Sequence, residues 1–193
     1  MRIGVLAMQG DFREHLIVLR KLGVSAIEVK SPEDMSKVDG LIIPGGESTT
    51  IGKLMSRNGL DREIKVKHSQ GIPIYGTCAG VILMAKEIEG SKQPRLAIAD
   101  ISVARNAYGG QLDSFEADIL FQKSKLHSVF IRAPIISRTS KGVEVLAYHK
   151  KNPVLLRQGN LLMSTFHPEL TQDARIHKYF LGMCSKRMKG KIH

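Results

Sequence analysis

A cysteine stands between two glycines in the segment Gly76-Thr77-Cys78-Ala79-Gly80. Apolar runs precede it at 72–75 and follow it at 81–85, so the pattern predicts a strand, a sharp turn and a helix. A thiol at the start of a helix is favoured as the thiolate, its nucleophilic form. The segment therefore indicates covalent acyl transfer by Cys78. A buried structural cysteine beside a tight turn would give the same five residues.

A histidine and a glutamate lie two residues apart at the end of a predicted strand, in Ser164-Thr165-Phe166-His167-Pro168-Glu169. In an extended chain the two side chains would project to the same side. A carboxylate can fix the tautomer of an imidazole and stabilise the imidazolium that forms when it accepts a thiol proton. His-x-Glu by itself is typical of an ordinary surface pair, but with the elbow cysteine it predicts a triad of Cys78, His167 and Glu169.

A pair of glycines follows the apolar run 41–43 in the segment 44–50, Pro-Gly-Gly-Glu-Ser-Thr-Thr. Backbone N–H groups in such a turn suit an oxyanion or a carboxylate, and Ser48, Thr49 or Thr50 could cap the next helix. A plain turn or a phosphate-binding loop is the alternative. The spacing excludes a Walker loop, because Leu54 follows Gly52-Lys53.

The elements that must position these segments alternate between strands and helices in the first half of the chain. We expect strands at 2–7, 26–29, 40–43 and 72–75 and helices at 11–22, 50–57, 60–68 and 79–87. From about residue 96 strands dominate, at 101–105, 115–121, 129–131, 143–148, 154–157 and 161–165, before a last helix at 171–187. This order predicts one three-layer α/β domain over residues 1–193, with a mostly parallel, doubly wound sheet and a β-rich second half. The three segments would meet at the carboxyl ends of the strands.

The composition restricts the kinds of partner. The net charge is +11, and four of the last eight residues are basic. A basic surface can attract nucleic acid, but the chain has no Trp and no basic stretch interleaved with aromatic residues, so we expect no nucleic-acid partner. The basic tail, about 186–193, is expected to be a solvated helix end or a docking segment for an acidic partner.

Other features argue against membranes, metals and organic cofactors. No apolar stretch is long enough to span a bilayer, and two cysteines indicate a reducing compartment, with the cytoplasm as the default. Cys-x-x-Cys and His-Glu-x-x-His are both absent from the sequence, so no metal is expected. A dinucleotide fingerprint is absent too, and we expect no cofactor.

Several segments together resemble the triad-type (class I) glutamine amidotransferases, in particular the glutaminase subunits of pyridoxal 5′-phosphate synthase. These segments are 4–10 with 12–15, 44–50, 75–80, 105–109, 113–116, 129–134 and 167–171. The elbow is common to many amidotransferases, whereas Gly-Glu-Ser-Thr-Thr at 46–50 and Arg-Asn-Ala-Tyr-Gly at 105–109 are much more specific to this subunit. At Gly110 the sequence departs from the family, which usually has arginine there, so we assign no role to that position.

The resemblance implies that Cys78 attacks the side-chain amide of glutamine, with His167 and Glu169 completing the triad. Backbone N–H groups of Gly46 and Ala79 would form the oxyanion hole, since both flank turns beside the cysteine. Contacts to the α-amino and α-carboxylate groups of the substrate would come from Gly46, Glu47, Ser48, Arg105, Ile131 and Arg132.

A synthase subunit is the implied partner, which would combine the ammonia with a pentose phosphate and a triose phosphate. Gln9 and Gly10 would help to complete the oxyanion hole when that partner docks, and we expect weak glutaminase activity without it. The alternatives are a glutaminase of purine or histidine synthesis, a γ-glutamyl hydrolase or cysteine peptidase, and a non-catalytic binding module.

Overall fold

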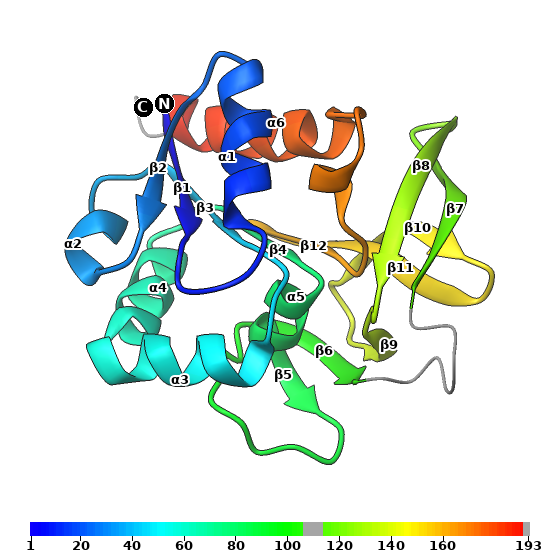
Figure 1. The fold of residues 1–193 in the computed structure, drawn as a ribbon, viewed down its shortest axis with the longest axis horizontal. Helices are drawn as coiled ribbons and strands as arrows, with labels where there is room; N and C mark the ends of the chain where they lie inside the picture. The colour runs from blue at the N-terminus through cyan, green and yellow to red at the C-terminus, as the bar shows by residue number, and fades with distance from the viewer. Residues whose placement is uncertain (106–113, 191–193) are drawn as a thin grey trace.

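The computed structural model describes residues 1–105 and 114–190. Its main sheet has seven strands (Figure 1), in the order β10 (Glu144–His149), β11 (Asn152–Gln158), β12 (Leu161–Ser164), β4 (Ile74–Thr77), β3 (Gly40–Ile43), β1 (Arg2–Leu6) and β2 (Ser25–Val29). The five strands from β12 to β2 are parallel, and β10 and β11 are antiparallel to their neighbours. Gly110 and the last three residues of the basic tail lie outside the described residues.

Helices cover both faces of this sheet because its strands alternate buried side chains between the two faces. In β1, Ile3 and Val5 join one apolar cluster and Leu6 joins the other. The first cluster includes residues of α1 (Phe12–Lys21) and α6 (Arg175–Lys189). The second includes residues of α2 (Pro32–Met35), α3 (Ser48–Asn58), α4 (Leu60–Ser69) and α5 (Ala79–Met84). The predicted three-layer α/β fold is thereby confirmed.

The second half adds two small strand assemblies beside the main sheet (Figure 1). One is a three-stranded sheet of β5 (Ala85–Ile88), β6 (Ala99–Ala104) and β9 (Ile135–Thr139), and the other is the hairpin of β7 (Ser114–Phe121) and β8 (Ser124–Ile131). The hairpin places Ile131 and the residue after it near the carboxyl ends of β4 and β12, as the contacts described below show.

Several sequence-based expectations about elements were wrong. The helix expected at 79–87 ends at Met84, because Ala85 is extended (ψ 139°) and 85–88 pair with β6 as a strand. The last helix begins at Arg175, after a 3-10 turn η1 (Pro168–Leu170). Strand β9 and the short helix α2 were not expected at all. In these cases long-range pairing or a local cap decided the structure over apolar periodicity.

The search for membrane-spanning helices among the described residues found none that combines the necessary length and apolar character.

Candidate active site

The elbow places Cys78 in a strained backbone conformation between β4 and α5. Its φ of 46° and ψ of −104° lie in a region that residues other than glycine seldom adopt. The turn needs glycine at position 80, because a Cβ there would lie 2.2 Å from the carbonyl oxygen of Ile43. The backbone N–H of Cys78 donates to Ser164 at the end of β12, 2.8 Å away, and its Sγ lies 3.7 Å from the carbonyl oxygen of Ile131. The thiol is thus fixed at the edge of the sheet.

His167 and Glu169 meet on the 3-10 turn η1 rather than on an extended strand, which corrects the geometry expected from their spacing. Nδ1 of His167 lies 2.7 Å from Oε1 of Glu169, and the Glu169 side chain is fully buried. Burial opposes protonation of His167, but its interactions with Cys78 and Glu169 raise its pKa to about 10. The imidazole therefore lies between a thiol and a carboxylate: its Nδ1 is bonded to Glu169, and its Nε2, which has no hydrogen-bond partner among the described residues, is available to a proton.

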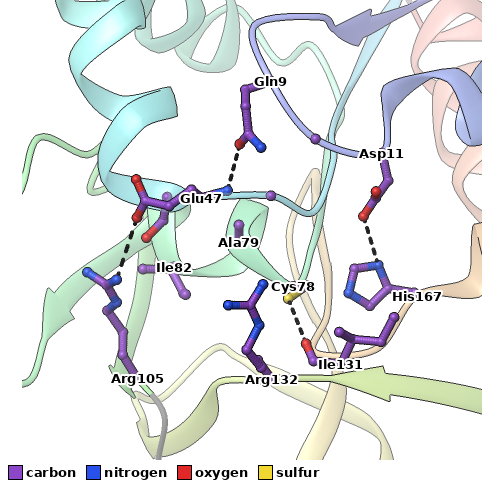
Figure 2. A pocket seen from close by; sticks show the side chains of 13 residues that line it. Gln9, Asp11, Glu47, Cys78, Ala79, Ile82, Arg105, Ile131, Arg132 and His167 are labelled. Carbon is purple, nitrogen blue, oxygen red and sulfur yellow. Dashed lines mark hydrogen bonds and ion pairs between the residues drawn. The ribbon is translucent and has the colours of Figure 1, made fainter. Parts of the chain in front are cut away.

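Cys78 and His167 line a pocket of about 400 Å³ (Figure 2). Its lining consists of Gln9, Gly10, Asp11, Gly46, Glu47, Ser48, Cys78, Ala79, Ile82, Arg105, Ile131, Arg132 and His167. Every residue predicted for the site except Glu169 is in this set, and Asp11 and Ile82 are additions. The structure thus brings together residues from six separate stretches of the sequence.

One end of the pocket carries a carboxylate and two guanidinium groups. Glu47 caps α3, accepting hydrogen bonds from the N–H groups of Thr49 and Thr50 at 3.0 and 2.7 Å. Burial acts to raise its pKa, but these hydrogen bonds outweigh burial and lower it to about 2. Arg105 lies 3.6 Å from the carboxylate of Glu47, and Arg132 extends into the pocket beside Cys78 (Figure 2). Charges of both signs suit the α-amino and α-carboxylate groups of an amino acid.

Helix α3 begins differently from the expectation. It starts at Ser48 instead of Thr50, and its cap is the Glu47 side chain rather than Ser48, Thr49 or Thr50. A carboxylate at this position accepts two N–H groups at once and gains from the positive end of the helix.

The loop between β1 and α1 is bonded to the Gly-Gly loop. The N–H of Glu47 donates to Oε1 of Gln9 at 2.6 Å, and the N–H of Asp11 donates to the carbonyl oxygen of Gly45 at 3.2 Å. Gly45 also lies against His167, since a Cβ at this glycine would be 2.4 Å from Cε1 of the imidazole. These contacts seat Gly46 next to the elbow, in a backbone conformation (φ 146°) that favours glycine.

Comparison with known proteins supplies the family. The family model of the SNO glutamine amidotransferases matches residues 5–186. The chain belongs to the SNO glutamine amidotransferase family. A solved structure described as a glutamine amidotransferase superposes with a TM-score of 0.92 at 50% identity, covering 95% of this chain and 98% of its own.

Two curated relatives of this amidotransferase share about half of its residues over nearly their whole length. The pyridoxal 5′-phosphate synthase subunit PdxT of Pseudothermotoga lettingae is 55% identical over 98% of this chain and 99% of its own. The subunit of the same name from Thermotoga neapolitana is 51% identical over 95% of this chain and 99% of its own.

Besides Ile82, sequence reasoning missed four polar side chains in or next to the pocket of this amidotransferase: Asp11, His15, Gln93 and His177. Oδ2 of Asp11 lies 3.5 Å from Nδ1 of His167, and Oε1 of Gln93 accepts hydrogen bonds from Ser48, Thr49 and Arg105. The two histidines are fully buried. A usable signal existed for them, because each occupies the apolar face of its helix at helical spacing.

One set of side chains has the spacing of a metal site. Asp11, His167 and Glu169 each offer an atom, and these atoms lie within 4.8 Å of one another. Nδ1 of His167 is already hydrogen-bonded to Glu169 within this set, so an ion would have to break the bond that orients the imidazole. We therefore assign these groups to proton transfer.

Proposed function

We propose that this amidotransferase hydrolyses L-glutamine to L-glutamate and ammonia through a triad of Cys78, His167 and Glu169. The Cys78 sulfur attacks the side-chain carbonyl carbon, and His167 passes the thiol proton to the departing ammonia. Water, deprotonated by the same imidazole, then cleaves the γ-glutamyl thioester and releases glutamate. The observation that carries the proposal is the buried hydrogen bond between His167 and Glu169. The imidazole that makes this bond also interacts with Cys78, whose backbone is strained.

The oxyanion formed in each step would be held by the backbone N–H groups of Gly46 and Ala79. Both residues line the pocket next to Cys78. Glu47 would receive the α-amino group of the substrate and Arg105 or Arg132 its α-carboxylate, with Gly46, Ser48 and Ile131 completing the contacts. Gln9, whose Oε1 accepts a hydrogen bond from the N–H of Glu47, and Gly10 would couple the Gly-Gly loop to a partner.

The ammonia would be consumed by a synthase subunit that makes pyridoxal 5′-phosphate. This part of the proposal is supported by the name that the relatives carry, pyridoxal 5′-phosphate synthase subunit. The chain's own residues need no metal or organic cofactor for the hydrolysis. We place the reaction in the cytoplasm, in keeping with the two free cysteines.

The test is glutamate release from glutamine, measured with and without the synthase subunit. We expect the partner to increase hydrolysis by roughly tenfold or more, and Cys78→Ala to reduce it by at least about 10⁴-fold while the circular dichroism spectrum stays unchanged. Cys184→Ala is the matched control, because Cys184 is buried against apolar residues outside the pocket. Full activity in Cys78→Ala would refute the catalytic assignment.

Two alternatives make different predictions in the same assay. A glutaminase of purine or histidine synthesis would hydrolyse glutamine but ignore this synthase subunit. A γ-glutamyl hydrolase would cleave γ-glutamyl peptides without any partner.

A further inference from the structure

A chain of buried polar side chains continues from Glu169 away from the pocket. Nε2 of His15 lies 3.3 Å from Oε2 of Glu169, the oxygen that His167 does not use. Nδ1 of His15 lies 3.0 Å from Nε2 of His177. His15 and His177 are fully buried, and Glu169 is 6% exposed. The far side of the carboxylate thus faces an imidazole that the proposed reaction does not use.

Three elements enclose this chain. His15 shares the inward face of α1 with Leu16 and Leu19, and His177 lies on the buried face of α6. The ring of Tyr75 contacts both imidazoles edge-on, with centroid distances of 6.4 and 6.3 Å. Oγ1 of Thr77, the residue before the elbow cysteine, lies 3.2 Å from Nε2 of His15. The apolar cluster on this side of the sheet includes Leu16, Leu19 and Phe180, so the orientation of each ring proton matters.

Both histidines are neutral in this setting. Burial, reinforced by the neighbouring imidazoles, lowers the pKa of His15 well below 6.5, and burial lowers that of His177 to about 4. A neutral imidazole has one N–H donor and one acceptor nitrogen. Two arrangements of the protons along the chain are therefore possible.

The hydrogen-bond partners select one of them. If Nδ1 of His15 carried the proton, its Nε2 lone pair would face the Glu169 carboxylate, and His177 would leave a buried N–H donor at Nδ1. Nδ1 of His177 has no partner among the described residues, and an unpaired buried donor is rarer than an unpaired acceptor. Protons on Nε2 of both rings remove both conflicts. His177 then donates to Nδ1 of His15, and the Nε2–H of His15 is hydrogen-bonded to Oγ1 of Thr77 at 3.2 Å. The same N–H lies 3.3 Å from Oε2 of Glu169, an oxygen that has no hydrogen-bond partner among the described residues and that a small turn of either side chain would let it reach.

We infer that His15, held in its Nε2–H tautomer by His177, is a positioning residue that donates to Glu169 and orients its carboxylate toward His167. This inference rests on the proposed role of Glu169 in glutamine hydrolysis. Burial raises the pKa of the Glu169 carboxyl above its ordinary value, against the lowering effect of His167. A buried carboxylate with one donor is free to turn or to take up a proton, whereas a second donor holds its plane and favours its charged form. The groups that face His167 directly are Cys78, Asp11 and Glu169, and His15 acts through the last of these.

The tautomer can be measured in the unmodified protein, independently of activity. In the full chain with ¹⁵N-labelled histidine, NMR should show the proton on Nε2 for both His15 and His177. A proton on Nδ1 of His15 would overturn the inference even if glutamine hydrolysis is confirmed. If hydrolysis fails instead, the same spectrum still reports which nitrogen of His15 carries the proton.

Two substitutions at His15 separate positioning from packing. His15→Leu removes the donor, and we expect kcat with the synthase subunit to fall by roughly 30-fold while KM stays within about twofold. The pH midpoint of His167 protonation, followed by ¹⁵N NMR, should fall by about one unit, since a less anionic Glu169 stabilises the imidazolium less. His15→Gln keeps an N–H near the position of Nε2 and should restore kcat to within about threefold of wild type.

Leu19→Ala is the matched control. Leu19 is buried on the same face of α1 but is not among the pocket residues, so this variant should melt at a lower temperature with the His167 midpoint and kcat unchanged. An unchanged kcat and midpoint in His15→Leu, or an equal drop of the midpoint in Leu19→Ala, would refute the inference. Should His15→Leu not fold, a proton on Nδ1 of His15 would still refute the inference, as would an unchanged His167 midpoint and kcat in His15→Phe, which also lacks the donor.

Discussion

The two sides of Glu169 each carry a buried histidine, and the two histidines differ in charge. On the pocket side, interactions with Cys78 and Glu169 overcome burial and raise the pKa of His167 to about 10. On the far side, burial and the imidazoles of His177 and His167 lower the pKa of His15 well below 6.5. The exposed fractions are almost the same, 3% and 0%.

The difference lies in what else each ring touches. His167 has a carboxylate oxygen at 2.7 Å and a thiol that can become an anion. His15 has a more distant carboxylate oxygen, a hydroxyl and a second imidazole. Burial alone therefore does not decide the charge of a histidine; the number and closeness of anionic partners do. One carboxylate can hold a charged ring on one side and a neutral ring on the other.

Removing the charge of Glu169 should abolish the difference in charge between His167 and His15, and it should lower activity more than a change to His15 or Asp11. In Glu169→Gln the imidazolium loses its anionic partner, so we expect the pKa of His167 to fall and kcat for glutamine hydrolysis to drop by roughly 10³-fold. Glutamate release and ¹⁵N NMR of the histidines measure the two effects. Glu63→Gln on the surface of α4 serves as the control, and equal activities in the two variants would contradict the assignment of Glu169.

The neutral, buried His177 should make the folded protein less stable at acid pH. The pKa of His177 is about 4 in the folded protein and about 6.5 when unfolded, so the unfolded state binds the extra proton between these values. The free energy of unfolding should then fall by about 1.4 kcal/mol per pH unit for this one histidine as the pH drops from 6.5 toward 4. Urea unfolding at several pH values measures the slope.

The variant His177→Gln has no titrating group at this position, and its slope should be flatter by that amount. His127→Gln on the exposed hairpin is the control. If His177→Gln keeps the slope of the wild type, the ring is not neutral and buried as described.

The carboxylate of Asp11, on the pocket side of His167, should have the smallest effect on activity. Oδ2 of Asp11 is 3.5 Å from Nδ1 of His167, but the Asp11 side chain is 41% exposed and water screens its charge. In Asp11→Asn we expect kcat to fall by no more than about threefold and the His167 midpoint to drop by less than about one unit. A loss as large as in Glu169→Gln would show that the imidazolium depends on both carboxylates equally.

Much of the fold could be predicted from local patterns. The buried run 40–43 is a strand with the predicted bounds, and the segments around 11–22 and 60–68 are helices. The region 79–88 could not be resolved in this way, because its apolar residues fit a helix and a strand equally well until β6 provides a pairing partner.

The sequence was sufficient to name a site residue as a candidate where its residue type is chemically distinctive. Cys78 between small residues, and His167 with Glu169, were candidates from their types and spacing, as were Glu47 and Arg105 from the family resemblance. His15, Gln93 and His177 were not, because a histidine or a glutamine in a helix or loop says nothing about its neighbours across the fold. Position 15 lies beside the inward residue Leu16 of α1, but no local pattern indicates what it meets across the fold.

The sequence by itself determined the α/β architecture, the elbow and the candidate nucleophile, because glycines, apolar periodicity and a single cysteine in a tight turn act over a few residues. Only the tertiary structure decided which side chains surround Glu169. Residues 15 and 77 come from stretches far from each other and from residues 167 and 177, and the parallel strands and the helices that cover them bring all four together. The charge of each histidine depends on those distances, and no local pattern encodes them.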